Sequence, residues 1–259
     1  KARVLQCERQ APRLTDVPVW NYDGTSTGQV QNVASSEMDL IPVALCTDPF
    51  RGAPHILVLC DTRVQTPIIT REHDATSRID TPRIETPRTR ALQIFTPDAV
   101  ARDAPWFGLE QEYVLFKDGA PLGQYKGSAY CSVGFHQAVG RELAFDHLDR
   151  CLQAGLCVAG MNAEVLCAQW EFQIGPCVGI DAADQLWLAR YILLRVAEMR
   201  GVHITFHPKP ANADQSGSGC HANFSTTRMR TTTAVLPGLM SRLAGDHARL
   251  MGTSDYGAR

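Results

Sequence analysis

The stretch from residue 157 to residue 201 limits the possible folds more than any other part of this sequence. Two strand-like runs, Cys157–Val165 and Trp170–Ile174, are separated by four residues, which is a connection of hairpin length. A helical segment follows at Asp181–Arg200, where leucine, alanine and valine recur at helical spacing until Gly201 ends the pattern. An antiparallel pair of strands followed by a helix favours an α+β fold.

The chain divides by pattern into three parts. Residues 1–62 read as short strands and turns, and residues 63–104 as a Thr-Pro-rich connecting segment, irregular until a short helix near 97–104. Residues 105–259 read as a larger domain of strands and helices. The other elements expected in that domain are strands at 106–116, 202–206 and 219–225 and helices at 135–154 and 232–251.

Composition excludes several classes of protein. The chain is 44% hydrophobic and 20% charged, as in globular proteins with a core, and its net charge of -2 argues against a nucleic-acid binder. Apolar runs end long before the roughly 18 residues of a membrane span. Nine cysteines without a Cys-x-x-Cys pair predict reduced thiols in a cytoplasmic protein. Because the first residue is Lys1 rather than Met, organelle targeting stays open.

An acidic pair occupies the strand expected at 106–116. Side chains alternate between the faces of a strand, so Glu110 and Glu112 share one face, while Leu109, Tyr113 and Leu115 point into a core. Two like charges on one face repel each other unless a cation lies between them or water screens them. A solvent-facing edge strand explains this spacing equally well, so the pair alone does not identify a metal site.

Two more carboxylates and a histidine extend the pattern. If the hairpin closes, Glu164 and Glu171 come side by side across the two strands. Both lie among apolar neighbours, where an unpaired carboxylate is costly. His221 shares a strand face with Asn223 and Ser225, although a single histidine is more often a satisfied core residue. Together these residues predict a site for a hard divalent ion, Mg²⁺ or Mn²⁺.

The motifs of the chain, taken in order, resemble those of eukaryotic-type glutamine synthetase from Arg3 nearly to Arg259. The resemblance implies a partial N-terminal β-grasp-like domain at 1–62 and a larger catalytic domain at 105–259, in which an antiparallel sheet carries flanking helices. It also implies that the chain is incomplete at both ends and that this fragment alone is inactive. The matching strings are Trp20–Thr27, Asp48–Arg51, Pro105–Tyr113, Asn162–Pro176, Asp184–Tyr191, Pro208–Pro210 and Gly219–Ser225.

The same resemblance implies the reaction and the residues that carry it. In the family, ATP phosphorylates the γ-carboxylate of L-glutamate, and ammonia then displaces phosphate to give glutamine. The subunits form a homo-oligomer, a decamer of two pentameric rings. The implied metal ligands are Glu110, Glu112, Glu164, Glu171 and His221. The implied nucleotide-binding residues are Glu110, Glu171, Phe172, Gln173, Ile174, Gly175, Pro176, Asn223, Phe224 and Ser225, and the substrate-binding residues are Glu164, Ser216 and Gly217.

Asp23 is the catalytic residue that the resemblance implies. It would attract ammonium and accept its proton, which is the role of a general base. The local sequence favours a simpler role, because aspartate before Gly24 is typical of an Asx turn.

The chain departs from the family pattern in two loops. Leu166-Cys167-Ala168 stands where the family has Met-Pro-Gly, and the loss of proline and glycine relaxes the backbone limits of that turn. Ser216 stands where the family has an asparagine, so the paired donor and acceptor of an amide are lost. Two alternatives therefore stay open. One is a non-catalytic, truncated or divergent relative, and the other is a sister ligase that joins glutamate to a different amine.

Overall fold

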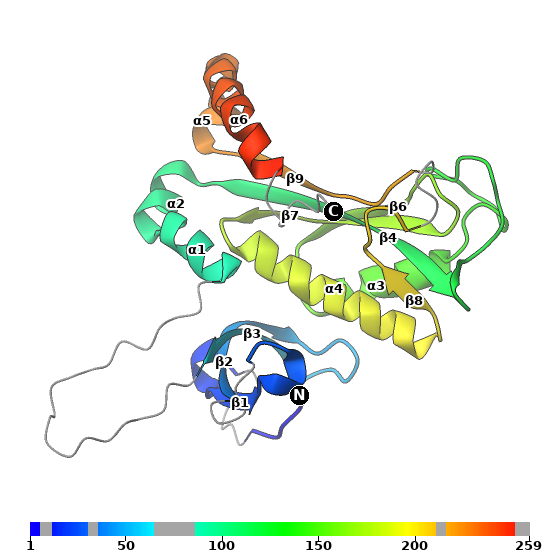
Figure 1. Cartoon of the computed structure of the whole chain (residues 1–259), viewed down its shortest axis with the longest axis horizontal. Coiled ribbons are helices and arrows are strands. Elements are labelled where there is room, and N and C mark those ends of the chain that lie inside the picture. Colours follow the sequence, from blue (N-terminus) through cyan, green and yellow to red (C-terminus); the bar gives the residue numbers. More distant parts are fainter. Residues whose placement is uncertain (6–11, 31–35, 65–85, 211–215, 252–259) are drawn as a thin grey trace, which may run out of the picture. The chain divides into compact units, whose positions relative to one another are not determined.

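The computed structural model describes residues 1–5, 12–30, 36–64, 86–210 and 216–251. The chain forms two compact units, Lys1–Ile94 and Phe95–Arg259. Both contain helices and antiparallel strands, so the α+β prediction is confirmed (Figure 1). In the described part of the chain, no helix is long and apolar enough to cross a membrane.

The first unit is built on a three-stranded antiparallel sheet. Strand β2 (Glu37–Thr47) lies between β1 (Trp20–Asp23) and β3 (Ile56–Val64). The register between β2 and β3 shifts at Pro42, which has no N–H to donate to a ladder. Met38 is fully buried in this unit.

Two helices occupy the segment that was expected to connect the domains. Helix α1 (Pro87–Ile94) ends the first unit, and α2 (Pro97–Asp103) opens the second. We expected only the second helix, so the prediction of an irregular segment is wrong for residues 87–94. The reason lies in the Thr-Pro pairs. The hydroxyl oxygen of Thr86 accepts a hydrogen bond from the Thr89 N–H (3.1 Å), and Pro87 is the first residue of α1.

The second unit is organised around strand β4 (Trp106–Lys117). It pairs with β7 (Gln169–Val178), which pairs in turn with β6 (Val158–Ala163). The remaining strands are short and also pair with β4, all of them antiparallel. They are β9 (Cys220–Ser225), β8 (His203–Thr205) and the β5 hairpin strand (Ala120–Pro121).

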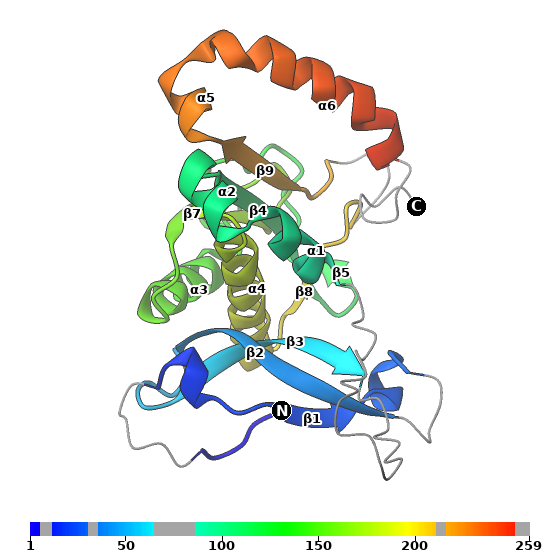
Figure 2. The same cartoon turned by 90° about the vertical axis from the view of Figure 1, so that its left-hand side faces the viewer.

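Helices α3 (Arg141–Gln153) and α4 (Asp181–Met199) lie side by side on one face of this sheet (Figures 1 and 2). The sheet residues on that face are large and apolar. Trp170 and Phe172 are each 1% exposed, and the Phe172 ring lies 4.8 Å from the ring of His147 on α3. Full burial of such a side chain stabilises a fold by roughly 1.5–3 kcal/mol. Leu115 and Tyr113 are buried as predicted, so the opposite face of β4 is left for polar residues.

Helix α3 begins six residues later than expected, because Gly140 precedes it in the left-handed conformation, with φ of 89°. A β-carbon at Gly140 would meet Leu115 at 2.1 Å, so the close approach of this loop to the core requires glycine. After β9 the chain continues into α5 (Thr227–Thr231) and α6 (Leu236–Met251), which begins four residues later than the helix expected from residue 232 (Figure 2).

Candidate active site on the polar face of the sheet

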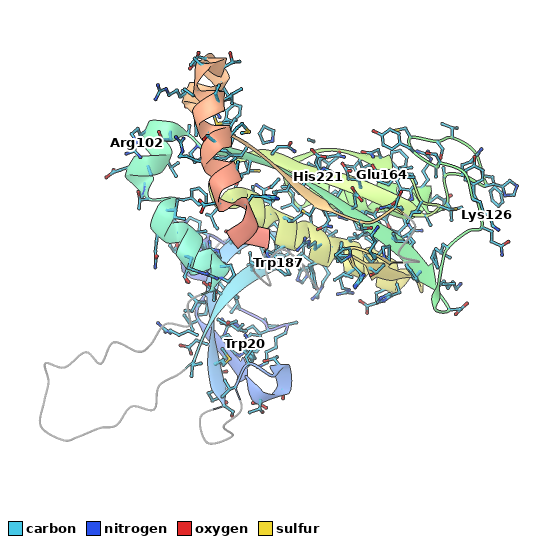
Figure 3. All side chains as sticks on the ribbon, turned by 45° about the horizontal axis from the view of Figure 1, so that its top comes forward. Trp20, Arg102, Lys126, Glu164, Trp187 and His221 are labelled. Atoms are coloured by element: carbon cyan, nitrogen blue, oxygen red, sulfur yellow. The ribbon has the colours of Figure 1, made fainter. Side chains whose placement is uncertain are left out.

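Strand register brings four of the five predicted metal ligands, Glu110, Glu112, Glu171 and His221, onto one face of the sheet. Glu112 pairs directly with Glu171 on β7, and Glu110 pairs with His221 on β9. Directly opposed residues of an antiparallel pair point to the same side. Figure 3 shows His221 and Glu164 over the strands, while Trp187 marks helix α4.

The hairpin differs in one detail from its prediction. Glu171 pairs with Asn162 on β6, and Glu164 lies beyond the end of that strand, where its N–H donates to the carbonyl oxygen of Gln169 (2.8 Å). Glu164 and Glu171 are therefore diagonal neighbours rather than directly opposed. Their charges still interact, since each appears in the electrostatic environment of the other.

The hairpin turn holds a residue other than glycine in a left-handed conformation. Ala168 adopts a φ of 61°, in the left-handed region that glycine favours. Alanine at this position therefore adopts the backbone conformation that glycine would adopt more easily. The turn is held by its own hydrogen bonds and by the Leu115 N–H, which donates to the Ala168 carbonyl (3.0 Å).

Each of the four carboxylates accepts a hydrogen bond from one amide side chain. These amides orient the carboxylates and leave further lone pairs available. Gln173 also donates to the Asn162 oxygen (2.8 Å), which links two of the pairs. The pairs are Gln169 with Glu112 (3.0 Å), Asn223 with Glu110 (2.5 Å), Asn162 with Glu164 (3.0 Å) and Gln173 with Glu171.

Gln169 connects three segments of the site, and the sequence did not single it out. The side chain is 1% exposed. Its amide nitrogen contacts the Glu112 carboxylate, the Gly217 carbonyl (2.9 Å) and the Ser218 hydroxyl (3.2 Å). Its oxygen accepts from the Leu166 N–H (3.1 Å). The signal was available in the sequence, because a glutamine inside an apolar strand must find partners when it is buried.

The site carries excess negative charge. Glu171 is 8% exposed, and burial, followed by the charges of Glu164 and Glu110, raises its pKa, although Gln173 and His221 oppose the rise. Burial and then the charge of Glu112 raise the pKa of Glu164. His221 Nδ1 lies 3.7 Å from the Glu110 carboxylate. A bound cation would remove this repulsion.

The donor set fits a hard divalent cation. Carboxylate oxygens are the ligands that Mg²⁺ and Mn²⁺ prefer. The carboxylates of Glu110, Glu112 and Glu171 share this face with His221, and Glu164 lies near Glu112 and Glu171. Within the described ranges, no three histidine, cysteine, aspartate or glutamate side chains are close enough to form a finished cage. The carboxylates point instead toward their amide partners. The candidate ligands therefore lie near one another without surrounding a common point.

A cavity of about 400 Å³ adjoins the acidic residues at the β9 end of β4. Gly175 has a φ of 112°, and a β-carbon there would meet the Phe107 carbonyl oxygen at 2.5 Å, so this wall requires glycine. Of the residues implied for the nucleotide, those that line the cavity are Glu110, Gln173, Ile174, Gly175, Pro176, Asn223, Phe224 and Ser225.

Two residues implied for the nucleotide do not line this cavity. Phe172 points to the opposite face of the sheet, where it packs against His147 and Tyr113, so its side chain cannot contact a nucleotide here. Glu171 belongs to the neighbouring cluster of carboxylates. Arg230, which was not predicted, lies at the edge of the cavity. Its guanidinium is 3.9 Å from the Trp106 ring and donates to the Ser225 hydroxyl (2.8 Å).

The remaining predicted residues lie in two places. Ser216 is exposed beside Gly217, and residues 213–215 of the same loop lie outside the described ranges. Asp23 ends β1 in the first unit and accepts hydrogen bonds from the Thr25 N–H (3.0 Å), the Thr25 hydroxyl (2.7 Å) and the Ser26 hydroxyl (2.8 Å). This is the Asx turn that its sequence context predicts. These bonds, led by that of the Thr25 side chain, lower the pKa of Asp23.

Comparison with known proteins decides the family. The model of the glutamine synthetase catalytic domain matches residues 90–236. The chain belongs to the glutamine synthetase family. It is 44% identical over 241 residues to a chloroplastic glutamine synthetase of Brassica napus, covering 89% of this chain and 52% of that protein. It is 42% identical over 262 residues to a cytosolic isozyme of Daucus carota, covering 96% and 69%.

The glutamine synthetase fold also appears among solved structures. The GmaS/ADP complex in conformation 1 superposes with a TM-score of 0.61 at 17% identity, covering 81% of this chain and 46% of that one. This likeness concerns the fold alone. The chain spans about half the length of the chloroplastic glutamine synthetases that it matches.

Proposed function

We propose that the protein is a glutamate–ammonia ligase, which joins ammonia to the γ-carboxylate of L-glutamate with ATP as co-substrate and γ-glutamyl phosphate as intermediate. The observation that carries this proposal is the shared sheet face, where Glu110, Glu112, Glu171 and His221 lie beside the cavity, with Glu164 near them. Membership of the glutamine synthetase family supports it, and so do the names of the relatives.

The acidic residues would hold two ions of Mg²⁺ or Mn²⁺. Glu112, Glu164 and Glu171 would bind one, and Glu110 with His221 would contribute to the other. The ions would neutralise the charge of the phosphates during transfer. The amide partners of the carboxylates would fix the orientation of these ligands.

The cavity would take the nucleotide. Phe224, which is 41% exposed, gives it an apolar wall against which a base can stack, and Asn223 supplies a polar edge. Arg230 is the cation at its rim and would contact the phosphates, because guanidinium groups pair well with phosphate oxygens.

Glutamate and ammonium would bind to residues at strand ends and in the loops that follow them. Glu164, Ser216 and Gly217 would contact glutamate. Asp23 would attract ammonium and accept its proton, and its lowered pKa keeps the carboxylate ionised, as a cation site requires.

We place the protein in a homo-oligomer, a decamer of two pentameric rings. Its free cysteines suit a reducing compartment such as the cytoplasm, and its relatives are named both cytosolic and chloroplastic.

The test combines binding with turnover. Calorimetry with Mn²⁺ and with ATP should detect both ligands on the purified protein, and Glu171→Gln should lose Mn²⁺ binding. The formation of glutamine from glutamate, ammonium and MgATP is then measured with the same preparation. Loss of both binding events would overturn the proposal. Binding without turnover agrees with the inactivity expected of this stretch alone, and absence of turnover in the full-length protein would identify the non-catalytic relative. Turnover with a different amine in place of ammonium would identify the sister ligase.

A further inference from the structure

Two cysteine side chains meet at the start of helix α4. Cys157 is exposed in the turn before β6, and Cys177 is buried in β7. The Cys157 carbonyl accepts a hydrogen bond from the Gly175 N–H (2.8 Å), and the Cys157 sulfur lies 3.9 Å from the Pro176 carbonyl oxygen. Cys177 directly follows Pro176 in the chain, so the Cys157 sulfur lies beside the backbone that carries the Cys177 thiol, and the two thiols interact electrostatically. All the cysteines in the described ranges are free.

The first turn of α4 holds both cysteines in place. The Cys157 N–H donates to the side-chain oxygen of Gln185 (2.6 Å), and the amide of Gln185 donates to Asp181 (2.9 Å). The Asp181 carboxylate also acts on the Cys177 thiol, whose pKa it raises. The two strands and the helix thus keep the thiols together in the folded protein.

The two thiols have different chemical roles available. Burial, followed by the negative charges of Cys157 and Asp181, raises the pKa of Cys177 to about 12, so this thiol is a poor first nucleophile. Cys157 is the one that a solvent-borne oxidant can reach. An accessible thiol beside a second thiol is the usual arrangement of a reversible oxidation site.

We propose that Cys157 and Cys177 are an oxidation site that closes to an intrachain disulfide when the protein meets a hydroperoxide. The Cys157 thiolate attacks one peroxide oxygen, the O–O bond breaks, and the departing oxygen leaves as water or an alcohol. The Cys157 sulfenic acid is then attacked by the Cys177 sulfur, and the S–O bond breaks with release of water. The two thiols lose two electrons and two protons, and the peroxide gains them.

The disulfide would alter the wall of the cavity. Gly175 and Pro176 line the cavity, and Cys177 follows them directly. Bond formation would bring the two sulfurs to about 2.05 Å from each other and move this wall. A loss of ATP affinity on oxidation follows, and this consequence rests on the proposed function, whereas the disulfide itself does not.

The test uses the purified protein, treated with hydrogen peroxide, blocked with an alkylating reagent and digested without reductant. Trypsin does not separate the two cysteines, because no lysine or arginine lies between Cys151 and Ala189. A protease that cleaves after glutamate separates them at Glu164 and Glu171. We expect a linked pair of peptides, lighter than the reduced pair by two hydrogens, from protein that runs as a single chain on a non-reducing gel.

Variants make the result specific. Cys157→Ser and Cys177→Ala should each abolish the linked pair, whereas Cys167→Ser, at a cysteine that lies between them in the sequence, should leave it unchanged. Recovery of both cysteines separately alkylated after peroxide treatment, or a link that survives in either variant, would overturn the assignment.

ATP affinity should fall severalfold in the oxidised protein and recover with dithiothreitol. If the disulfide forms and ATP affinity does not change, the effect on the cavity is wrong. Absence of ATP binding in the reduced protein would instead count against the proposed function.

Discussion

The amide nitrogen of Gln169 donates a hydrogen bond to Glu112 Oε2 over 3.0 Å, which joins the hairpin of β6 and β7 to the central strand. The same oxygen of Glu112 accepts from the Gly219 N–H at 3.1 Å. Glu112 is therefore fixed by two donors from different segments before any ion binds. This arrangement leads directly to the first prediction.

Gln169→Leu should weaken Mn²⁺ binding by roughly ten- to a hundredfold, as the loss of an outer-shell partner of a metal ligand does elsewhere. It should also lower the free energy of unfolding by about 1–3 kcal/mol, because buried groups lose their partners. Calorimetric titration and urea denaturation measure the two effects. Gln124→Leu, at an exposed glutamine outside the site, is the matched control. An unchanged Mn²⁺ affinity in Gln169→Leu would show that the amide does not position Glu112.

Glu171→Gln should separate stability from metal binding. Burial and neighbouring charges raise the pKa of Glu171, so the ionised group destabilises the metal-free fold, and its neutral isostere should raise the melting temperature without metal. Added Mn²⁺ should then raise the melting temperature of the unmodified protein by mass action but not that of the variant. Thermal denaturation with and without Mn²⁺ checks both halves, and an equal Mn²⁺ shift in both proteins would contradict this role for Glu171.

His147 should make the protein less stable in acid. Burial lowers its pKa from the 6.5 of an ordinary histidine to about 4. As pH falls below 6.5, the unfolded chain binds a proton at this residue and the folded protein does not, so stability is lost until about pH 4. The loss is on the order of 3 kcal/mol. Urea denaturation from pH 7 to pH 4 should show a smaller loss in His147→Leu than in His247→Gln, an exposed control.

Arg230→Met should reduce ATP affinity by roughly tenfold or more, which is the scale of one lost charge-assisted hydrogen bond. Mn²⁺ affinity should be unchanged, because Arg230 lies at the far edge of the cavity from the hairpin carboxylates. Arg228→Met, on the same short helix α5, is the control. Equal ATP affinity in the two variants would remove Arg230 from the phosphate site.

Ala168→Gly should stabilise the protein, by about 0.5–1 kcal/mol. The left-handed conformation of Ala168 is unfavourable for any residue with a β-carbon, and relief of this strain outweighs the extra freedom that glycine gives the unfolded chain. The measurement is the midpoint of urea unfolding. Ala129→Gly, at another buried alanine, should destabilise instead.

Residue spacing was enough to predict part of the site. Side chains alternate strictly along a strand, so Glu110 and Glu112 had to share a face once residues 106–116 were a strand, and the structure confirms this. The exact register of the hairpin could not be read in the same way. It depends on the turn, where Ala168 adopts a conformation that its side chain disfavours, and this placed Asn162 rather than Glu164 opposite Glu171.

The contacts made between distant segments were beyond sequence reasoning. Gln169 meets Gly217 only after the sheet has formed, and Arg230 reaches Trp106 across more than a hundred residues. The Thr-Pro pairs were ambiguous for a different reason. The same dipeptide suits a loop and a helix start, and local sequence does not decide between them.

The division of the sheet into an apolar face and an acidic face has a consequence for how this chain can change over generations. On the face that packs against the helices, a substitution survives only if the protein still folds, because Trp170, Phe172 and His147 are packed there. On the acidic face, a substitution survives only if the site still works. The two selective pressures act on alternate residues of the same strands, so the acidic face can change while the core on the other face stays intact. A descendant of this protein could therefore acquire a different site, or lose the proposed reaction altogether, and still be inherited as a well-folded protein.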